Sequence, residues 1–173
     1  LYFWAIRLTS HFEYNKKYNP ILALKIKLAD KLIYSKWREA LGGNIVYIVS
    51  GGAALQPKIA RVLGMAKMFN IEGYGLTETS PVISVNNPAK SEMKIGTVGT
   101  VLDGFEVKIA EDGEILCKGP GVMKGYYKSP ELTAEVIDEN GWFHSGDIGV
   151  FEDEIYLKIT DRKKEIFKLS GGK

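Results

Sequence analysis

The chain has 173 residues, enough for one sizeable core or two small ones. Hydrophobic residues at 45% and charged residues at 25% exclude a disordered chain, and no apolar run reaches the ~18 residues that a membrane-spanning helix needs. A net charge of +2, with no basic run interleaved with aromatic residues, argues against nucleic acid as a partner.

The single cysteine, Cys117, forbids an internal disulfide and fits a reducing compartment. It lies in an alternating, strand-like run with no His nearby in sequence, so we interpret it as a packed structural thiol. The sequence starts without Met, in mid-pattern at Leu1, and shows no signal peptide. We therefore expect a piece of a longer, cytoplasmic protein.

Residues 1–41 are predicted to be helical, because apolar residues recur every three or four positions. The main stripe comprises Leu22, Ile26, Ala29, Ile33 and Trp37, with Leu24, Leu28 and Leu32 beside it. Since this apolar face is wide, we expect most of it to be buried. Eight basic side chains against three acidic ones leave two interpretations, a solvated helix face or a basic surface in peripheral contact with anionic lipid.

Residues 44–50 are a short β-branched apolar run of the kind found in buried parallel strands, and residues 68–72 form the next predicted strand. Between them, small residues predict a turn at 50–54, and Pro57 predicts the start of a helix. The loops at Ser50 and Gly73 would then follow the carboxyl ends of two strands in one sheet, where open α/β sheets bind ligands. This favours a nucleotide site at that edge.

The run at 71–79, IEGYGLTET, carries the densest set of polar groups. Gly73 and Gly75 flank Tyr74, so the backbone can bend sharply and we expect the ring to be exposed as a stacking surface. Thr77 can donate to phosphate oxygens, and Glu78 is a hard oxygen ligand of the kind that Mg²⁺ selects. If this run is considered alone, the alternative interpretation is a hairpin turn whose polar side chains have no binding role.

Beyond Pro88 the apolar period changes from 3.6 to 2. A hairpin is predicted from strands at 105–109 and 114–118, followed by a short helix at 131–137. Further strands are predicted at 142–144, 148–151 and 155–159, and a charged linker at 161–165. The predicted fold class is α/β: part of an open α/β sheet layer with flanking helices, followed by a small distorted β-barrel subdomain.

Four separated sequence blocks occur in one order along the chain. They lie at 50–55 (SGGAAL), 74–79 (YGLTET), 141–147 (GWFHSGD) and 161–165 (DRKKE). Together they resemble the AMP-forming acyl-CoA synthetases of the adenylate-forming enzyme superfamily, over nearly the whole chain. Residues 125–128 (GYYK) and 160–165 (TDRKKE) are most similar to long-chain fatty-acid CoA ligases.

The resemblance implies two half-reactions. A fatty-acid carboxylate attacks the α-phosphate of ATP to give an acyl-adenylate and pyrophosphate, and the thiol of CoA then displaces AMP. ATP or AMP, Mg²⁺ and CoA are therefore the implied cofactors. Because the first step brings two anions together, it needs Mg²⁺ and fixed hydrogen-bond donors rather than a covalent protein nucleophile.

The resemblance also implies roles for individual residues. Those implied for nucleotide binding are Gly51, Gly52, Ala53, Tyr74, Gly75, Thr77, Asp147 and Arg162, with Tyr74 and the backbone of 51–53 at adenine. Thr77 would contact phosphate, Glu78 would ligate Mg²⁺, and Asp147 would accept hydrogen bonds from both ribose hydroxyls. Arg162 would reach the ribose and phosphate, and Lys164 matches the pivot of a hinge. Thr77, Glu78, Arg162 and Lys164 form the implied catalytic set.

The sequence departs from the family pattern at both ends. The phosphate-binding loop, a Ser/Thr/Gly-rich run ending in Lys-Gly, is absent, and so is the C-terminal lid with its adenylation lysine, a role that Lys173 does not fill. The expected domains are 1–97, part of a large N-terminal domain; 98–160, the barrel subdomain; and 161–173, the hinge and the start of the lid. We expect the complete protein to be a ligase and this chain alone to be inactive.

Two alternatives stay open at this point. Aryl- and amino-acid-adenylating enzymes share the nucleotide-binding blocks, although the long apolar region at 11–36 favours a fatty-acid substrate. A binding module that keeps the nucleotide pocket without catalysis is the second alternative. The presence of Glu78, Asp147 and Arg162 together argues against a degenerate pocket.

Overall fold

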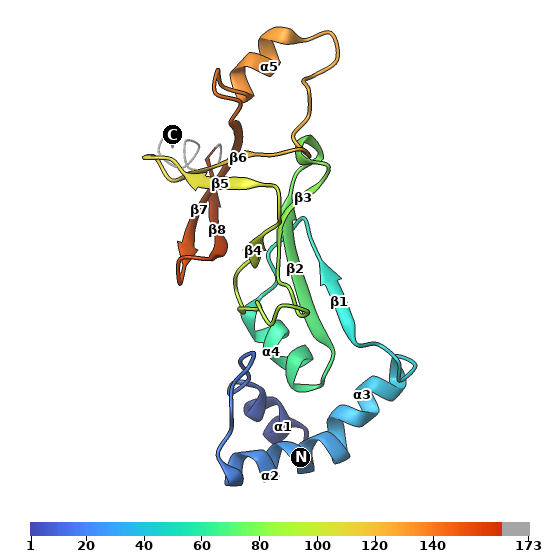
Figure 1. Ribbon diagram of the computed structural model, residues 1–173. Helices are drawn as coiled ribbons and strands as arrows, with labels where there is room; N and C mark the ends of the chain where they lie inside the picture. Colours follow the sequence, from blue (N-terminus) through green and yellow to red (C-terminus); the bar gives the residue numbers. More distant parts are fainter. Residues whose placement is uncertain (164–173) are drawn as a thin grey trace, which may run out of the picture. The chain divides into compact units, whose positions relative to one another are not determined.

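The computed structural model describes residues 1–163, which form two compact units (Figure 1). Unit 1 comprises residues 1–72 and 87–96, and unit 2 comprises residues 73–86 and the described chain from residue 97 on. Residues 73–86 group with the C-terminal strands rather than with the helices of unit 1. Assignment of 1–97 to a larger N-terminal domain stays a prediction.

Unit 1 begins with helices α1 (Tyr2–Thr9), α2 (Pro20–Ala29) and α3 (Ser35–Ala40), with a π-helical turn at Asp30–Tyr34 between the last two. The expected helical content is confirmed, but the single stretch is interrupted at 10–19. Helix α2 starts at Pro20 because the Asn19 side chain accepts a hydrogen bond from the Leu22 amide (2.9 Å), and Pro supplies a helical φ at the first position.

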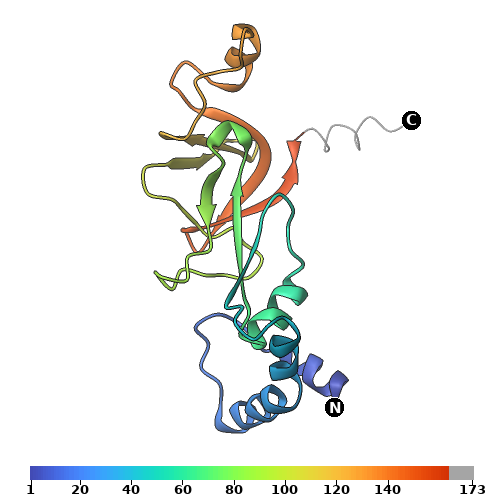
Figure 2. The same ribbon diagram turned by 90° about the vertical axis from the view of Figure 1, so that its right-hand side faces the viewer.

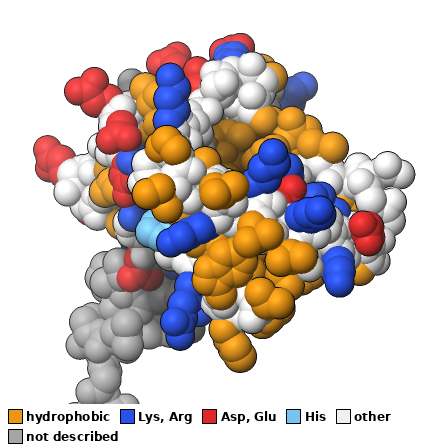
Figure 3. All heavy atoms as spheres, turned by 90° about the horizontal axis from the view of Figure 1, so that it is seen from below, with side chains coloured by type: hydrophobic (Ala, Val, Ile, Leu, Met, Phe, Trp, Pro, Cys, Tyr) orange, Lys and Arg blue, Asp and Glu red, His pale blue; other side chains and the backbone are white. Residues whose placement is uncertain are grey.

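The core of unit 1 gathers one face of these helices around Tyr34, which is fully buried and donates to the Ala5 carbonyl at 2.7 Å. The expectation that most of the wide apolar face is buried is wrong for the adjoining stripe on α2, because Leu24 and Leu28 are 69% and 49% exposed. Apolar and basic side chains gather on the face seen in Figure 3. Contact of this face with lipid stays a prediction. None of the described helices has the length and apolarity needed to cross a membrane.

Unit 1 also holds the predicted βα segment. Strand β1 (Tyr47–Ser50) pairs in parallel with the first half of β2 (Phe69–Gly75), and the register runs from Tyr47 opposite Phe69 to Ser50 opposite Glu72. Helix α4 (Pro57–Met65) connects the two strands. The parallel arrangement predicted from the sequence is confirmed, so the residues that follow β1 and Glu72 start from the same edge of the pair.

Within unit 2, residues 73–75 continue as strand and do not form the predicted loop. They pair antiparallel with β3 (Val82–Val85), which in turn pairs with β4 (Thr100–Val101). The turn comes later, in a 3₁₀-helix at Thr77–Thr79. Gly75 is required here, because a Cβ at this position would overlap the Pro81 carbonyl group.

The remainder of unit 2 is a curled antiparallel sheet. Its strands are β5 (Glu106–Ile109), β6 (Glu114–Lys118), β7 (Phe143–Glu152) and β8 (Tyr156–Arg162), in the order β5-β6-β7-β8, and helix α5 (Pro130–Val136) precedes β7. Strand β7 bends strongly (Figure 2), and backbone hydrogen bonds join Leu157 of β8 to Val98 and Gly99 at 2.8 Å. These features give the sheet a half-barrel form, in agreement with the small distorted β-barrel predicted from the short strands.

Two boundaries in this sheet differ from the sequence prediction. The separate strands predicted at 142–144 and 148–151 are one strand, β7, and residues 161 and 162 belong to β8 rather than to a linker. Cys117 is fully buried in the core with Ile115 and Leu157, and burial raises the pKa of its thiol to about 11. The interpretation of Cys117 as a structural thiol is confirmed.

Candidate functional site

Three of the predicted site residues meet in unit 2. Asp147 lies on β7, and its carboxylate accepts a hydrogen bond from the Tyr74 hydroxyl on β2 (Oδ2, 2.7 Å). Arg162, the register partner of Asp147 on β8, places its Nε 3.4 Å from Asp147 Oδ1. The Asp147 side chain is 10% exposed and that of Arg162 is 68% exposed. A nearly buried carboxylate is thus held from one side by a phenol and from the other by an exposed guanidinium.

The Tyr74 ring differs from its expected state. It is only 7% exposed and packs in the core cluster of unit 2, so the prediction of an exposed stacking surface is wrong. Packing with core residues distant in the sequence, such as Ile115 and Phe143, buries the ring, and the flanking glycines did not reveal this packing. Burial and the neighbouring Asp147 carboxylate raise the pKa of Tyr74, so its hydroxyl stays protonated and donates to Asp147.

A bulge in β7 presents Asp147. Glu114 lies opposite Ile148 and Leu116 opposite His144, so one residue of β6 faces three residues of β7, 145–147. Gly146 adopts a φ of +74°, which glycine takes up without strain. The Ser145 hydroxyl accepts a hydrogen bond from the Asp147 amide at 3.1 Å. The amide therefore has a side-chain partner at the point where the bulge interrupts the hydrogen bonds between β6 and β7.

The predicted metal ligand lies on the 3₁₀-helix. Glu78 Oε1 accepts a hydrogen bond from the Tyr126 hydroxyl at 3.0 Å, and its other carboxylate oxygen has no hydrogen-bond partner among residues 1–163. Thr77, the predicted phosphate contact, is exposed beside it. No cluster of three or more His, Cys, Asp or Glu occurs in the described part of the chain. One available carboxylate still fits Mg²⁺, which typically uses one or two carboxylates and completes its shell with substrate phosphates and water.

The predicted adenine loop belongs to unit 1. Gly51, Gly52 and Ala53 follow β1 and are exposed. Their conformation is tied to β2 through the Leu55 amide, which donates to the Glu72 carboxylate at 3.3 Å. Burial raises the pKa of Glu72, which is 7% exposed. Glu72 therefore anchors the loop that the resemblance assigns to adenine.

Lys164, the predicted hinge pivot, lies outside the described residues. Sequence reasoning missed Glu72, Glu114 and Tyr126, each of which contacts a residue within one of the matched sequence blocks. Tyr126 lies in the GYYK run, which carries part of the family resemblance but predicts no site role for this residue. For Glu114, a carboxylate between a hairpin turn and an apolar strand was the available signal.

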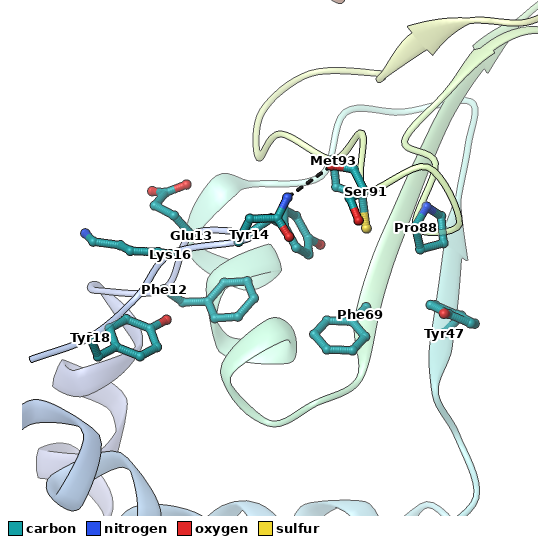
Figure 4. Close-up of a pocket in the computed structure, with 11 residues that line it drawn as sticks. Phe12, Glu13, Tyr14, Lys16, Tyr18, Tyr47, Phe69, Pro88, Ser91 and Met93 are labelled. Carbon is teal, nitrogen blue, oxygen red and sulfur yellow. Dashed lines mark hydrogen bonds between the residues drawn. The ribbon is translucent and has the colours of Figure 1, made fainter. Parts of the chain in front are cut away.

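Unit 1 also contains an aromatic pocket of about 320 Å³ (Figure 4). The rings of Phe12, Tyr14 and Phe69 lie around it, and Asn15 donates to the Ser91 carbonyl at 3.0 Å. None of the site residues predicted from the sequence lines this pocket.

Comparison with known proteins gives consistent matches. The family model described as AMP-binding enzyme matches residues 6–127. The long-chain-fatty-acid–CoA ligase FadD15 of Mycobacterium bovis is 42% identical over 156 residues, which cover 89% of this chain and 26% of that protein. Fatty acyl-CoA synthetase A of Dictyostelium discoideum is 37% identical over 185 residues, which cover 98% and 27%.

Among solved structures, o-succinylbenzoate CoA synthetase (MenE) from Bacillus subtilis in complex with AMP matches with a TM-score of 0.61 and 28% identity, over 76% of this chain and 30% of that chain. The chain spans about a quarter of the length of the curated relatives that it matches.

Proposed function

Because the chain belongs to the AMP-binding enzyme family, we propose that the complete gene product is an ATP-dependent long-chain fatty-acid CoA ligase. It would activate a carboxylate as its acyl-adenylate and transfer the acyl group to CoA, with release of pyrophosphate and AMP. Identity near 40% to two relatives named for fatty-acid activation supports this choice of substrate.

The observation that carries the proposal is the Asp147 carboxylate, held between the Tyr74 hydroxyl and Arg162. A carboxylate has four lone-pair positions, and these two contacts leave acceptor capacity for both ribose hydroxyls of AMP. The side chain of Arg162 is exposed, and the guanidinium N–H groups that do not face Asp147 can donate to a phosphate. In this proposal Tyr74 acts through its hydroxyl, by orienting Asp147, in addition to any contact with adenine.

Glu78 and Thr77 supply the groups for the phosphoryl chemistry. Attack of one anion on another is slow unless the charge that develops on the phosphate oxygens is neutralised. Mg²⁺, when bound, would neutralise part of that charge, and the available Glu78 oxygen would hold it. Thr77 would donate its hydroxyl to a phosphate oxygen, and the backbone of 51–53 would line adenine.

The decisive measurement is pyrophosphate release by the complete gene product with ATP, Mg²⁺ and a panel of carboxylic acids. Saturable release with palmitate, and palmitoyl-CoA formation after CoA is added, is the expected result. Release only with aryl or amino acids would favour the first alternative. No release with any acid, combined with calorimetric binding of AMP, would favour a non-catalytic nucleotide-binding module.

A second prediction concerns the metal. In the complete gene product, Glu78→Gln is expected to lower the rate of pyrophosphate release by at least about 100-fold, because loss of one preorganised electrostatic contact commonly has that effect. The Mg²⁺ concentration for half-maximal rate should rise in parallel. Glu131→Gln, on the exposed first turn of α5, is the matched control and should behave as wild type. An unchanged Mg²⁺ dependence in Glu78→Gln would exclude Glu78 as the metal ligand.

A further inference from the structure

Glu114 is a buried carboxylate with three partners and no role assigned so far. It is the first residue of β6 and is 4% exposed. Its Oε1 accepts the Gly146 amide at 2.8 Å, and its Oε2 accepts Lys163 Nζ at 2.7 Å and lies 3.2 Å from His144 Nδ1. A buried carboxylate persists only where charge and hydrogen bonds compensate its desolvation, and all three contacts do so here.

The pKa of Glu114 depends on the balance between burial and these contacts. Burial by itself would raise the pKa of Glu114, but hydrogen bonds from Lys163, Gly146 and His144 outweigh burial, and the pKa is lowered. Asp112 also pairs with Lys163, at 2.7 Å. The carboxylate therefore stays ionised at neutral pH.

The Gly146 contact is the one that reaches the site. Because β7 bulges at 145–147, the Gly146 amide points out of the ladder and donates to a side chain from the neighbouring strand. The next residue is Asp147, whose carboxylate meets Tyr74 and Arg162. The Gly146 amide belongs to the 145–146 peptide, so a rotation of that peptide would shift the backbone that leads into Asp147 and move its carboxylate relative to Tyr74 and Arg162.

We propose that Glu114 is a positioning residue, whose contact with the Gly146 amide fixes the β7 bulge so that Asp147 faces the ribose. This inference rests on the proposed function of Asp147. Lys163 and His144 hold the Glu114 carboxylate in place, and Gly146 transmits its position. The geometry of Asp147 thus depends on the reach of the Glu114 side chain more than on its charge.

A pair of substitutions in the complete gene product separates reach from charge. Glu114→Asp keeps the charge for Lys163 but is one methylene shorter, so its carboxylate withdraws from the Gly146 amide. Glu114→Gln keeps the reach and an acceptor oxygen, and Lys163 retains Asp112 as its partner. Glu152→Gln is the matched control, because it breaks a Lys–Glu pair of 2.8 Å in the β7–β8 hairpin, away from the bulge.

We expect Glu114→Asp to raise the KM for ATP and the dissociation constant of AMP by at least about tenfold, because small displacements of a binding group are costly. The KM for the carboxylic acid should stay within about twofold, since Asp147 serves only the nucleotide in this proposal. Glu114→Gln should stay within about threefold of wild type for both nucleotides, because its acceptor oxygen still reaches the Gly146 amide. Thermal unfolding of each variant identifies effects that arise from misfolding.

The inference would be overturned if Glu114→Gln lost nucleotide affinity while Glu114→Asp kept it. It would also be overturned if both variants lost nucleotide affinity equally, or if neither variant lost it. If Glu114→Asp fails to fold, a Gln variant that folds and loses AMP binding would equally overturn it, and retained binding in Gln would support it. Failure of the proposed function is separate, because it is seen as absence of pyrophosphate release with palmitate in wild type, whereas this inference is tested by the AMP affinity of the two variants relative to wild type.

Discussion

Gly75→Ala is expected to lower the free energy of unfolding of unit 2 by about 3 kcal/mol or more, at the upper end of the range for overpacking. A Cβ on Gly75 would overlap the Pro81 carbonyl group and lie 2.8 Å from the Val82 Cα. All of these neighbours are backbone atoms, which cannot rotate away as a side chain can. The strand pair β2–β3 would have to separate at the point where the chain enters the 3₁₀-helix of Thr77 and Glu78.

Gly73→Ala is the matched control for this prediction. Gly73 lies two residues earlier on the same strand, and a Cβ there would be 3.4 Å from its nearest neighbour, the Ser84 carbonyl oxygen, at ordinary contact distance. Urea unfolding of the 173-residue chain, followed by circular dichroism, should show a lower midpoint for Gly75→Ala than for Gly73→Ala. Equal midpoints would mean that β2 and β3 are not as close at Gly75 as the structure has them.

Asp147→Asn should raise the dissociation constant of AMP for the complete gene product by about 10- to 100-fold, the equivalent of about 1.5–3 kcal/mol for hydrogen bonds to a charged group. Asparagine has a single acceptor oxygen, and the Tyr74 hydroxyl already donates at this position. The amide group of Asn would then face Arg162 or a ribose hydroxyl with a donor in place of an acceptor.

The control for Asp147→Asn is Asp153→Asn, in the exposed turn between β7 and β8. Asp153 has a φ of +48°, a region that Asn also tolerates, so this substitution changes charge without straining the turn. Calorimetric titration of both variants with AMP provides the comparison. Wild-type affinity in Asp147→Asn would exclude its carboxylate from nucleotide binding.

The order of the elements could be predicted because it depends on local patterns. The small-residue turn after β1 and the period-2 run around Cys117 each carry their own signal. The failures arise where distant segments meet. Tyr74 looks exposed between two glycines, and only its packing with distant residues such as Ile115 and Phe143 buries it. The two strands predicted around residue 146 are a single bulged strand, because a bulge interrupts the alternation as a loop does.

The candidate site was predictable in its residue types but not in its connections. Asp147 and Arg162 stand in matched sequence blocks, whereas their contact needs the register of β7 and β8. Glu114 lies 32 residues from Gly146 and 49 from Lys163 in sequence, so no local pattern links them. The interruption of the helical region before α2 could have been predicted from the sequence, because Asn19 followed by Pro20 is a helix-start signal.

The sealed environment of Cys117 has a practical consequence for work on the 173-residue chain. Its thiol has no solvent access and stays protonated at neutral pH, so maleimide reagents should leave the native chain unlabelled. A cysteine introduced at an exposed position, such as Tyr127→Cys (87% exposed), would then be the sole attachment point for a fluorophore or spin label. Nucleotide-dependent changes could be followed without first removing the natural thiol.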